Sequence, residues 1–362
     1  EIGIHERTLD AIISLVNNGD CLGAWQMLSK KVLTPSVPFP KHKNLFELIY
    51  KNSPIQPAPC WIPSEEEITQ TNISKLKSEL GLQSYWDLHR WSITNREAFW
   101  QKLISLLGIQ FNTQPKAIMG GQSAKTPDLL TGGVLNIFDS CIDDTSEKNA
   151  VVYRNEGGAL CFLTHKELNV QCNRVANGLV KLGFKKGDAI AIDMVMTVDS
   201  VAIYLGILKA GCVAVSIADS LAPQEVQKRL EISDAKALFT QDVILRGSKH
   251  LPLYEKVLQA DPAMVIVLSA GETIEVSIRV QDILWEDFLS ENESFSTVPC
   301  HPMDPVNILF SSGTTGEPKA IPWNHTTPIK CAADGYLHHD IQKGDVVSWP
   351  TNLGWMMGPW LI

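Results

Sequence analysis

The segments AIAIDMVM (189–196), VDSVAIYLGILKA (198–210) and CVAVSIA (212–218) decide the class of fold. The first and last are short apolar runs with the length of buried strands, and the middle segment has the length of a helix. Outward from this unit the alternation continues, with helices predicted at 164–183, 224–232 and 253–260 and strands at 237–240 and 264–269. Short apolar strands separated by amphipathic helices form a mainly parallel sheet with helices on both faces. The predicted fold class is therefore α/β.

Two helices are predicted to begin with a capping box. Thr164 and Glu167 open one of them, and Thr94 and Glu97 open another that stops at Gly108. In a capping box the hydroxyl and the carboxylate each satisfy a backbone amide of the first turn. The second helix lies within an aromatic cluster at 84–108, and we interpret its apolar stripe as core packing rather than a ligand site.

The N-terminal residues carry weaker patterns. Residues 1–32 are predicted to form a helical pair with two apolar stripes. The stripes consist of Ile4, Leu9, Ile12, Ile13 and Val16, and of Trp25, Leu28 and Val32. Prolines at 35, 38 and 40 predict a linker, and a second proline-rich stretch covers 54–63.

The composition excludes several functional classes. The 362 residues suggest about two domains. A formal net charge of -9 without a clustered basic face argues against nucleic acid as a partner. The eight cysteines are scattered, so we expect reduced thiols packed as small apolar side chains in a reducing, intracellular compartment. No apolar run reaches the ~18 residues of a membrane span, and the start does not resemble a signal peptide.

The segment that carries the chemistry follows a buried strand predicted at 306–310. It reads SSGTTGEPK (311–319), and its candidate ligand-binding residues are Ser311, Ser312, Gly313, Thr314, Thr315, Gly316 and Lys319. Glycine lets a backbone approach a ligand closely, hydroxyls and amides donate to phosphate oxygens, and a lysine faces a polyphosphate with positive charge. A flexible linker is the alternative, but a linker needs no strand before it and no Pro-Lys after it. We interpret the segment as a phosphate loop.

This loop differs from that of P-loop NTPases, in which the lysine opens a helix. Here Lys319 follows a proline, and the next residues are predicted to be extended. The following helix is predicted to begin later, with Thr327 as N-cap and Pro328 in its first turn.

The loop resembles the nucleotide-phosphate signature of the acyl-adenylate-forming superfamily, which includes acyl-CoA synthetases, luciferases and peptide-synthetase adenylation domains. The stretches LTHKEL (163–168), NRVA (173–176) and LKAG (208–211) are similar to other motifs of that superfamily. The aromatic stretch at 84–100, RGSK (246–249) and Gly-Trp (354–355) resemble acetyl- and acetoacetyl-CoA synthetases. The plant peroxisomal acyl-activating enzymes are the most similar in pattern. The resemblance covers residues 80–362.

The resemblance implies a ligase that uses ATP, coenzyme A and Mg²⁺. A carboxylic acid is joined to AMP with loss of pyrophosphate, and coenzyme A then displaces AMP. It assigns Lys319 and the loop residues to the β- and γ-phosphates, with Lys319 as the catalytic residue. Arg246 and Lys249 fall where acetyl-CoA synthetases contact phosphates of coenzyme A, although solvated surface charge is an equal alternative. Three residues fall at the acyl pocket and pantetheine tunnel, with core packing as the alternative; these are Trp355, Met356 and Met357.

Some positions depart from the pattern or remain open. Ala320 replaces a glycine that commonly follows the lysine, and His325 has a packed or capping role as its alternative. His338 and His339 are adjacent, so they do not share one helix face and do not form a metal pair.

The predicted organisation has three parts. These are a helical extension with linker (1–43), an acetyl-CoA-synthetase-type segment (44–140) and an incomplete AMP-binding domain (141–362). Because the chain starts with Glu1 and ends in an apolar segment at 354–362, we expect a fragment of the truncated large domain. The residues that would bind magnesium and ribose, and the mobile C-terminal domain, are expected downstream, so the piece alone is expected to be inactive. A peroxisomal or otherwise cytoplasmic location is expected.

Two other functions remain as alternatives. The first is a non-catalytic protein that binds a nucleotide or coenzyme A on the same scaffold. The second is adenylation that feeds a carrier protein or a luciferase-type oxidation, which the stretch at 84–100 disfavours.

Overall fold

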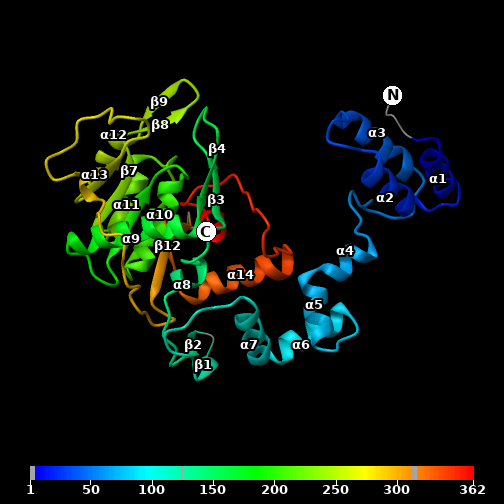
Figure 1. The fold of residues 1–362 in the computed structure, drawn as a ribbon, viewed down its shortest axis with the longest axis horizontal. Helices are drawn as coiled ribbons and strands as arrows, with labels where there is room; N and C mark the ends of the chain where they lie inside the picture. The colour runs from blue at the N-terminus through cyan, green and yellow to red at the C-terminus, as the bar shows by residue number, and fades with distance from the viewer. Residues whose placement is uncertain (1–4, 124, 312, 314–315) are drawn as a thin grey trace. The chain divides into compact units, whose positions relative to one another are not determined.

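The computed structural model describes residues 5–123, 125–311, 313 and 316–362 (Figure 1). The chain forms two compact units, Glu1–Leu88 and His89–Ile362, and the boundary falls within helix α6 (Tyr85–Thr94). Among the described residues, no helix combines the length and the apolar character that crossing a membrane requires.

The first unit is helical. Its helices are α1 (Glu6–Asn17), α2 (Cys21–Lys31), α3 (Phe39–Tyr50), α4 (Glu65–Gln70) and α5 (Asn72–Glu79). The first three of them share a core of Ile12, Ala24, Trp25, Leu28, Ile49 and Tyr50. The predicted helical pair is confirmed for α1 and α2, although Ile4 lies outside the described residues and Leu9, Ile13 and Val16 are exposed. The predicted linker is shorter than expected, because Pro40 is accommodated in the first turn of α3.

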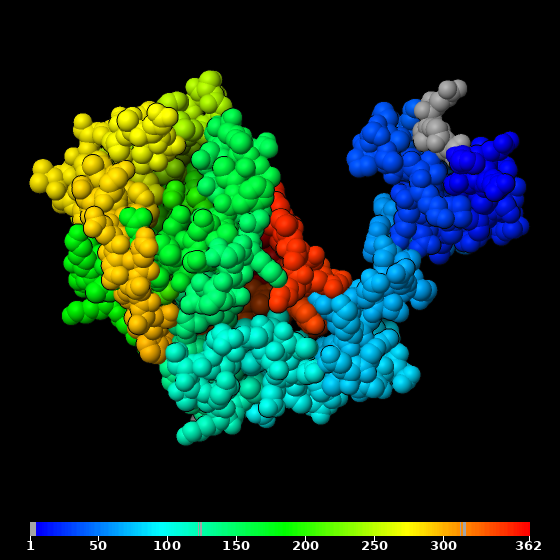
Figure 2. Space-filling view, in the orientation of Figure 1, coloured from blue at the N-terminus to red at the C-terminus, as the bar shows by residue number. Residues whose placement is uncertain are grey.

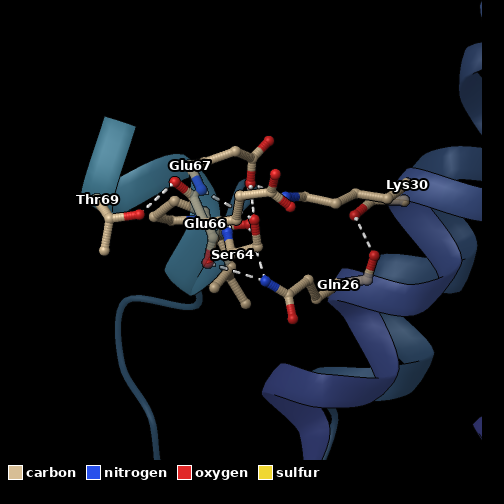
Figure 3. Close-up of polar contacts among 9 residues, drawn as sticks. Gln26, Lys30, Ser64, Glu66, Glu67 and Thr69 are labelled. Atoms are coloured by element: carbon tan, nitrogen blue, oxygen red, sulfur yellow. Dashed lines mark hydrogen bonds and ion pairs between the residues drawn. The ribbon is translucent and has the colours of Figure 1, made fainter. Parts of the chain in front are cut away.

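Helix α2 holds the segment that leads into α4 (Figure 3). Gln26 Nε2 donates to the Pro63 carbonyl at 2.9 Å, and the Lys30 ammonium pairs with the Glu67 carboxylate. The same carboxylate accepts from the Ser64 amide at 2.6 Å and closes a capping box. The proline-rich stretch is thus fixed by side chains rather than by helix or strand.

The second unit is built on a seven-stranded sheet with the order β11-β10-β7-β5-β6-β12-β13. The strands are β5 (Ala189–Asp193), β6 (Val213–Ile217), β7 (Ala237–Gln241), β10 (Val265–Leu268), β11 (Ile283–Leu284), β12 (Pro305–Ser311) and β13 (Lys319–Asn324). All neighbours are parallel except β12 and β13, which form an antiparallel hairpin at one margin. The prediction of a mainly parallel α/β sheet is confirmed.

Helices cover both faces of this sheet. Ile190 and Ile192 of β5 pack in one buried cluster with α9 (His165–Lys181), α10 (Val198–Lys209) and α13 (Trp285–Phe288). Ala189 and Ala191 face the other side, with α11 (Pro223–Ser233) and α12 (Leu253–Leu258). Because successive side chains of a strand point to opposite faces, this alternation confirms the predicted helices on both faces.

Smaller elements complete the unit. They are α7 (Arg96–Leu106), α8 (Phe138–Cys141), α14 (Thr326–His338), α15 (Met357–Leu361) and the hairpins β1 (Ala117–Ser123) with β2 (Thr126–Thr131), β3 (Asn149–Arg154) with β4 (Leu160–Thr164), and β8 (Val243–Arg246) with β9 (Lys249–Pro252). Leu353, near the C-terminal end, is fully buried. Other parts of the C-terminal segment, drawn in red, reach the surface beside the green part of the chain (Figure 2).

One predicted capping box forms and the other does not. The Glu167 amide donates to Thr164 Oγ1 at 3.2 Å, and the Thr164 amide donates to Glu167 Oε2 at 2.8 Å, which confirms the first. The box at 94–97 is wrong, because Thr94 Oγ1 donates to the Arg90 carbonyl at 2.8 Å inside α6. Glu97 instead accepts from the Ile118 amide at 3.3 Å.

Helix α14 begins one residue before the predicted N-cap. It starts at Thr326, so Thr327 and Pro328 both lie in its first turn and the prediction of Thr327 as N-cap is wrong. The reason is that Asn324 Oδ1 accepts from the Thr326 amide at 3.0 Å and so satisfies the first turn from an earlier position.

All eight cysteines are free. Cys172, Cys212 and Cys300 are buried, whereas Cys60 is exposed and the other four are intermediate. The prediction that the thiols pack as small apolar side chains therefore applies fully to three of them.

Candidate functional site

The carboxyl ends of β5, β6, β7 and β12 meet at one edge of the sheet, because these strands are parallel. The connection from β5 to β6 runs through α10 on one face, and the connection from β6 to β7 runs through α11 on the other. Adjacent strands whose connections leave on opposite faces open a crevice at their carboxyl ends, which is where open α/β sheets bind ligands. The connections change face between β5 and β6, so the crevice is expected at the carboxyl ends of these two strands.

The candidate phosphate loop joins β12 to β13 at the same edge. Ser311 is the last residue of β12 and is the cross-strand partner of Lys319, the first residue of β13. The β12–β6 register pairs Ile308 with Val215, so three residues further on Ser311 lies level with Ala218 at the end of β6. Ser312, Thr314 and Thr315 lie outside the described residues. The loop is the tip of a hairpin, consistent with the prediction that it is not a strand-to-helix P-loop.

The backbone of the loop needs glycine at Gly313. Its φ is 60°, and a Cβ atom there would lie 2.4 Å from the Glu317 carbonyl oxygen and 3.5 Å from Lys319 Cε. The Lys319 side chain therefore runs along the loop beside Gly313. Lys319 is exposed, and its ammonium makes no ion pair with any of the described residues. Gly316 also has a positive φ, of 84°. The structure thus brings Gly313 and Lys319 together.

Helix α11 anchors the far side of the loop. Lys228 Nζ lies 3.2 Å from Glu317 Oε1. The next residue, Arg229, is buried, with its guanidinium 5.3 Å from the centre of the Phe310 ring and 2.8 Å from Glu225 Oε2. The loop is therefore tied to the helix that covers one face of the sheet.

The segment before Trp355 lies in the crevice itself. Asn352 Nδ2 donates to Asp219 Oδ1 at 2.7 Å and to the Met194 carbonyl at 3.3 Å, and Asn352 Oδ1 accepts from the Gly354 amide at 2.7 Å. Gly354 passes so close to the end of β6 that a Cβ atom would lie 2.1 Å from the Ala218 nitrogen. Residues 352–354 therefore dock on the carboxyl ends of β5 and β6.

A buried ion pair lies at the same strand ends. Lys256 Nζ is 3.1 Å from Asp193 Oδ2, and it donates to the Asp219 carbonyl at 2.9 Å. The Oδ2 contact is an ion pair without hydrogen-bond geometry, whereas Oδ1 accepts from Lys256 at 3.4 Å. Burial raises the pKa of the Asp193 carboxyl to about 6, although Lys256 lowers it. No local pattern in the sequence predicts this pair, although an aspartate inside the apolar run AIAIDMVM is a signal for one of its members.

Two of the predicted acyl-site residues are largely exposed. Trp355 is 58% exposed and Met356 is 59% exposed, while Met357 is half-buried at the start of α15. Core packing therefore does not account for Trp355 and Met356.

Arg246 and Lys249 face each other across the tip of the β8–β9 hairpin, and both are exposed. Gly247, between them, donates its amide to Glu156 Oε1 at 2.9 Å. The structure brings the two cations to one hairpin tip, and no hydrogen bond or ion pair among the described residues links this tip to the loop at 311–319.

His325 has a packing role. It is 2% exposed, and its Nδ1 accepts from the Ile137 amide at 3.1 Å. Burial lowers the pKa of His325 to about 4, so the ring is neutral near pH 7. His338 and His339 contact different partners, namely Asp334 at 3.8 Å and the Trp360 ring at 5.3 Å. Within the described part of the chain, no group of three or more His, Cys, Asp or Glu side chains could hold a metal ion.

The open, mainly parallel sheet, with a glycine- and hydroxyl-rich loop sequence at its carboxyl edge, is an arrangement typical of α/β proteins that bind ligands at the carboxyl ends of their strands. Residues 138–362 match the family model described as "AMP-binding enzyme", which covers more than half of the chain. This chain belongs to the AMP-binding enzyme family, as its resemblance to the adenylate-forming superfamily predicted.

Known relatives agree with this membership. The chain is 42% identical to hexanoyl-CoA synthase of Cannabis sativa, over 93% of this chain and 51% of that protein. It is also 42% identical to probable acyl-activating enzyme 18, peroxisomal, of Arabidopsis thaliana, over 99% of this chain and 53% of that protein. The fold matches acetoacetyl-CoA synthetase from Streptomyces lividans with a TM-score of 0.77 at 24% identity, over 84% of this chain and 49% of that one. The chain spans about half the length of the curated relatives it matches.

Proposed function

We propose that this chain forms the nucleotide- and acyl-binding part of an AMP-forming acyl-CoA synthetase, an acid–thiol ligase. The observation that carries the proposal is the family match over 138–362, with the loop 311–319 at the carboxyl edge of the sheet. The names of two relatives at 42% identity, a hexanoyl-CoA synthase and a probable acyl-activating enzyme, support the same reaction.

The loop is proposed to hold the triphosphate of ATP. Backbone amides and the hydroxyls of Ser311, Ser312, Thr314 and Thr315 would donate to the β- and γ-phosphates. Gly313 and Gly316 give the backbone the positive φ that turns amides inward. Lys319 starts β13 beside this loop, and its ammonium would stabilise the negative charge that develops on the departing pyrophosphate.

The reaction has two steps. A carboxylate oxygen of the acid forms a bond to the α-phosphorus of ATP while the bond to pyrophosphate breaks, giving acyl-AMP. The sulfur of coenzyme A then bonds to the acyl carbon, AMP leaves, and the thiol proton is released. Adenylation is needed because a free carboxylate would otherwise have to expel oxide.

The remaining candidate residues are assigned to the other substrates. Trp355, Met356 and Met357 are proposed to line the acyl pocket and the path of the pantetheine arm. Their position beside the strand ends and the exposure of the first two support this role. Arg246 and Lys249 are proposed to contact phosphates of coenzyme A, supported by their pairing at one exposed hairpin tip.

Magnesium is proposed to arrive with the nucleotide as MgATP. When bound, it would neutralise part of the phosphate charge. The loop and Lys319 are the residues of this chain proposed to contact the phosphates that the ion accompanies.

A peroxisomal location is proposed from two relatives whose names carry that word. The test is the localisation of the full-length gene product with an N-terminal fluorescent tag, which leaves a C-terminal tripeptide address free. Diffuse cytoplasmic signal would contradict it.

The experiment that tests the function is ATP–pyrophosphate exchange by the full-length gene product with straight-chain acids from acetate to palmitate. Acid-dependent exchange, followed by CoA-dependent release of AMP, is expected. Nucleotide or coenzyme A binding by calorimetry without exchange for any acid would favour a non-catalytic binding protein. Exchange without a CoA-dependent step would favour adenylation for another acceptor.

A further inference from the structure

The crevice between β5 and β6, which in open α/β sheets receives a ligand, is filled here by the chain's own residues 352–354. The side chain of Asn352 makes three hydrogen bonds at this place, to Met194, Asp219 and Gly354. Because residues 352–354 are fixed at this edge of the sheet, they restrict where the backbone of the residues that follow them can lie.

The residues that follow are held by the same segment. The Trp355 amide donates to the Asn352 carbonyl at 3.1 Å, and the Gly358 amide donates to the Trp355 carbonyl at 2.9 Å. These bonds form two consecutive turns, so the backbone of 355–358 takes its position from Asn352. The exposed side chains of Trp355 and Met356 project from those turns.

The anchor of the segment is itself fixed by charge. Asp219 receives Asn352 through its carboxylate and Lys256 through its carbonyl, and Lys256 pairs with fully buried Asp193 at the end of β5. A buried ion pair contributes little net stability compared with apolar residues of the same volume, because both charges are removed from water. The ion pair does, however, fix the distance and the orientation between the two side chains, whereas contact between two apolar side chains is not directional.

We propose that Asp193, Lys256, Asp219 and Asn352 form a positioning network that sets the place of Trp355 and Met356 and thereby the acid that the enzyme accepts. This inference rests on the proposed function, because it takes residues 355–357 as the acyl site. None of the four touches the acid; they act through the backbone of 352–358.

The test is a set of variants of the full-length gene product, assayed with hexanoate and with acetate. Asn352→Asp places a carboxylate against that of Asp219 and removes the donor to Met194. It is expected to raise KM for the acid roughly tenfold and to leave KM for ATP within roughly twofold. Asp219→Asn keeps an acceptor for Asn352 but loses the charge, and it is expected to raise KM for the acid by less than Asn352→Asp does.

The exchanged pair Asn352→Asp with Asp219→Asn removes the repulsion and restores one hydrogen bond. It is expected to recover most of the acid affinity. The matched control is Asn177→Asp on α9, which removes an amide donor to the Asn173, Asn292 and Ser294 carbonyls. The control is expected to lower stability at most and to leave both KM values unchanged.

Hydrogen exchange of the amides at 354, 355 and 358 gives a readout that does not depend on activity. Faster exchange in Asn352→Asp, reversed in the exchanged pair, is expected. Three results would overturn the network: unchanged hydrogen exchange of these amides, an unchanged KM for the acid in an active enzyme, or equal effects on the KM values for the acid and for ATP. Absence of ATP–pyrophosphate exchange in the wild-type protein would instead overturn the proposed function. Amide hydrogen exchange would still decide whether the network holds residues 352–358.

Discussion

Lys319 is the described residue whose charge the proposed reaction uses most directly. Its side chain lies along the turn at Gly313, and it has no ion pair with a described residue that would neutralise it. We expect Lys319→Ala to lower acid-dependent ATP–pyrophosphate exchange roughly 100-fold, because a preorganised donor to developing charge is lost. Lys181→Ala, at the exposed end of α9, is the control. Equal exchange in wild type and Lys319→Ala would contradict the phosphate-loop assignment.

His325 gives the fold a dependence on pH. Its pKa falls from 6.5 to about 4 on folding because of burial, so the unfolded chain binds the proton more tightly. The neutral His325 ring therefore contributes to the free energy of unfolding fully above pH 6.5. This contribution, about 3 kcal/mol at most, is lost as the pH falls toward 4. We expect the urea midpoint of wild type to fall between pH 7 and 5 more than that of His325→Asn.

The difference between the two proteins is the quantity to compare, because Asp193 acts in the opposite sense. Burial raises the pKa of Asp193 to about 6, so its contribution to stability increases as the pH falls through that value. An identical pH dependence in wild type and His325→Asn would show that His325 titrates as an exposed histidine.

At the scale of elements, the two predicted capping boxes can be compared directly, because one forms and the other does not. Thr164 accepts from Glu167 at the start of α9, whereas Thr94 donates back into α6. We expect Thr164→Ala to lower the free energy of unfolding by about 1 kcal/mol, the usual value of an N-cap. Thr94→Ala should change it by less than about 0.5 kcal/mol. Denaturant titration measures both, and a larger loss for Thr94→Ala would contradict the observed bonding.

The elements of the sheet unit were predictable because their signal is local. Strands such as β5 and β6 are short, mainly apolar runs, and a helix such as α9 carries a regular apolar stripe. Spacing alone, however, could not distinguish Thr94 from Thr164. The two differ in what surrounds them: Thr94 already ends a preceding helix, so its hydroxyl is used there.

The candidate site was predictable only in part, for a physical reason. Lys319 and its glycines are neighbours in sequence and could be recognised as a pattern. Asp193 and Lys256 are 63 residues apart, and Asp219 and Asn352 are 133 apart. Such pairs meet only because β5 and β6 are adjacent in the sheet, and strand order is not written in any local pattern.

At the scale of the whole molecule, the two compact units have separate cores. The buried cluster of the first unit runs from Ile12 to Tyr50, and those of the sheet unit start at Leu130 and Ala189. The predicted boundaries at 43 and 140 stay a prediction about domain organisation. Those boundaries come from the resemblance to a family, whereas the division within α6 separates two parts of the chain that each pack mainly against themselves.

Separate cores predict that helices α1, α2 and α3, which hold the buried cluster of the first unit, can be removed without loss of the sheet. We expect a chain starting at Ser64 to keep the slow hydrogen exchange of β5, β6 and β7, because none of their buried neighbours comes from residues before it. Mass spectrometry of the exchanged peptides measures this, with the intact chain as control. Fast exchange throughout β5 to β7 would contradict it.

The order of the strands has a consequence for how the protein behaves at high concentration. At one margin β11 has only two residues, and at the other β13 carries Pro322, which has no amide hydrogen to offer. A second copy of the chain therefore finds few consecutive backbone donors along which to add a strand. This guards a strongly apolar sheet against edge-to-edge aggregation during folding and storage.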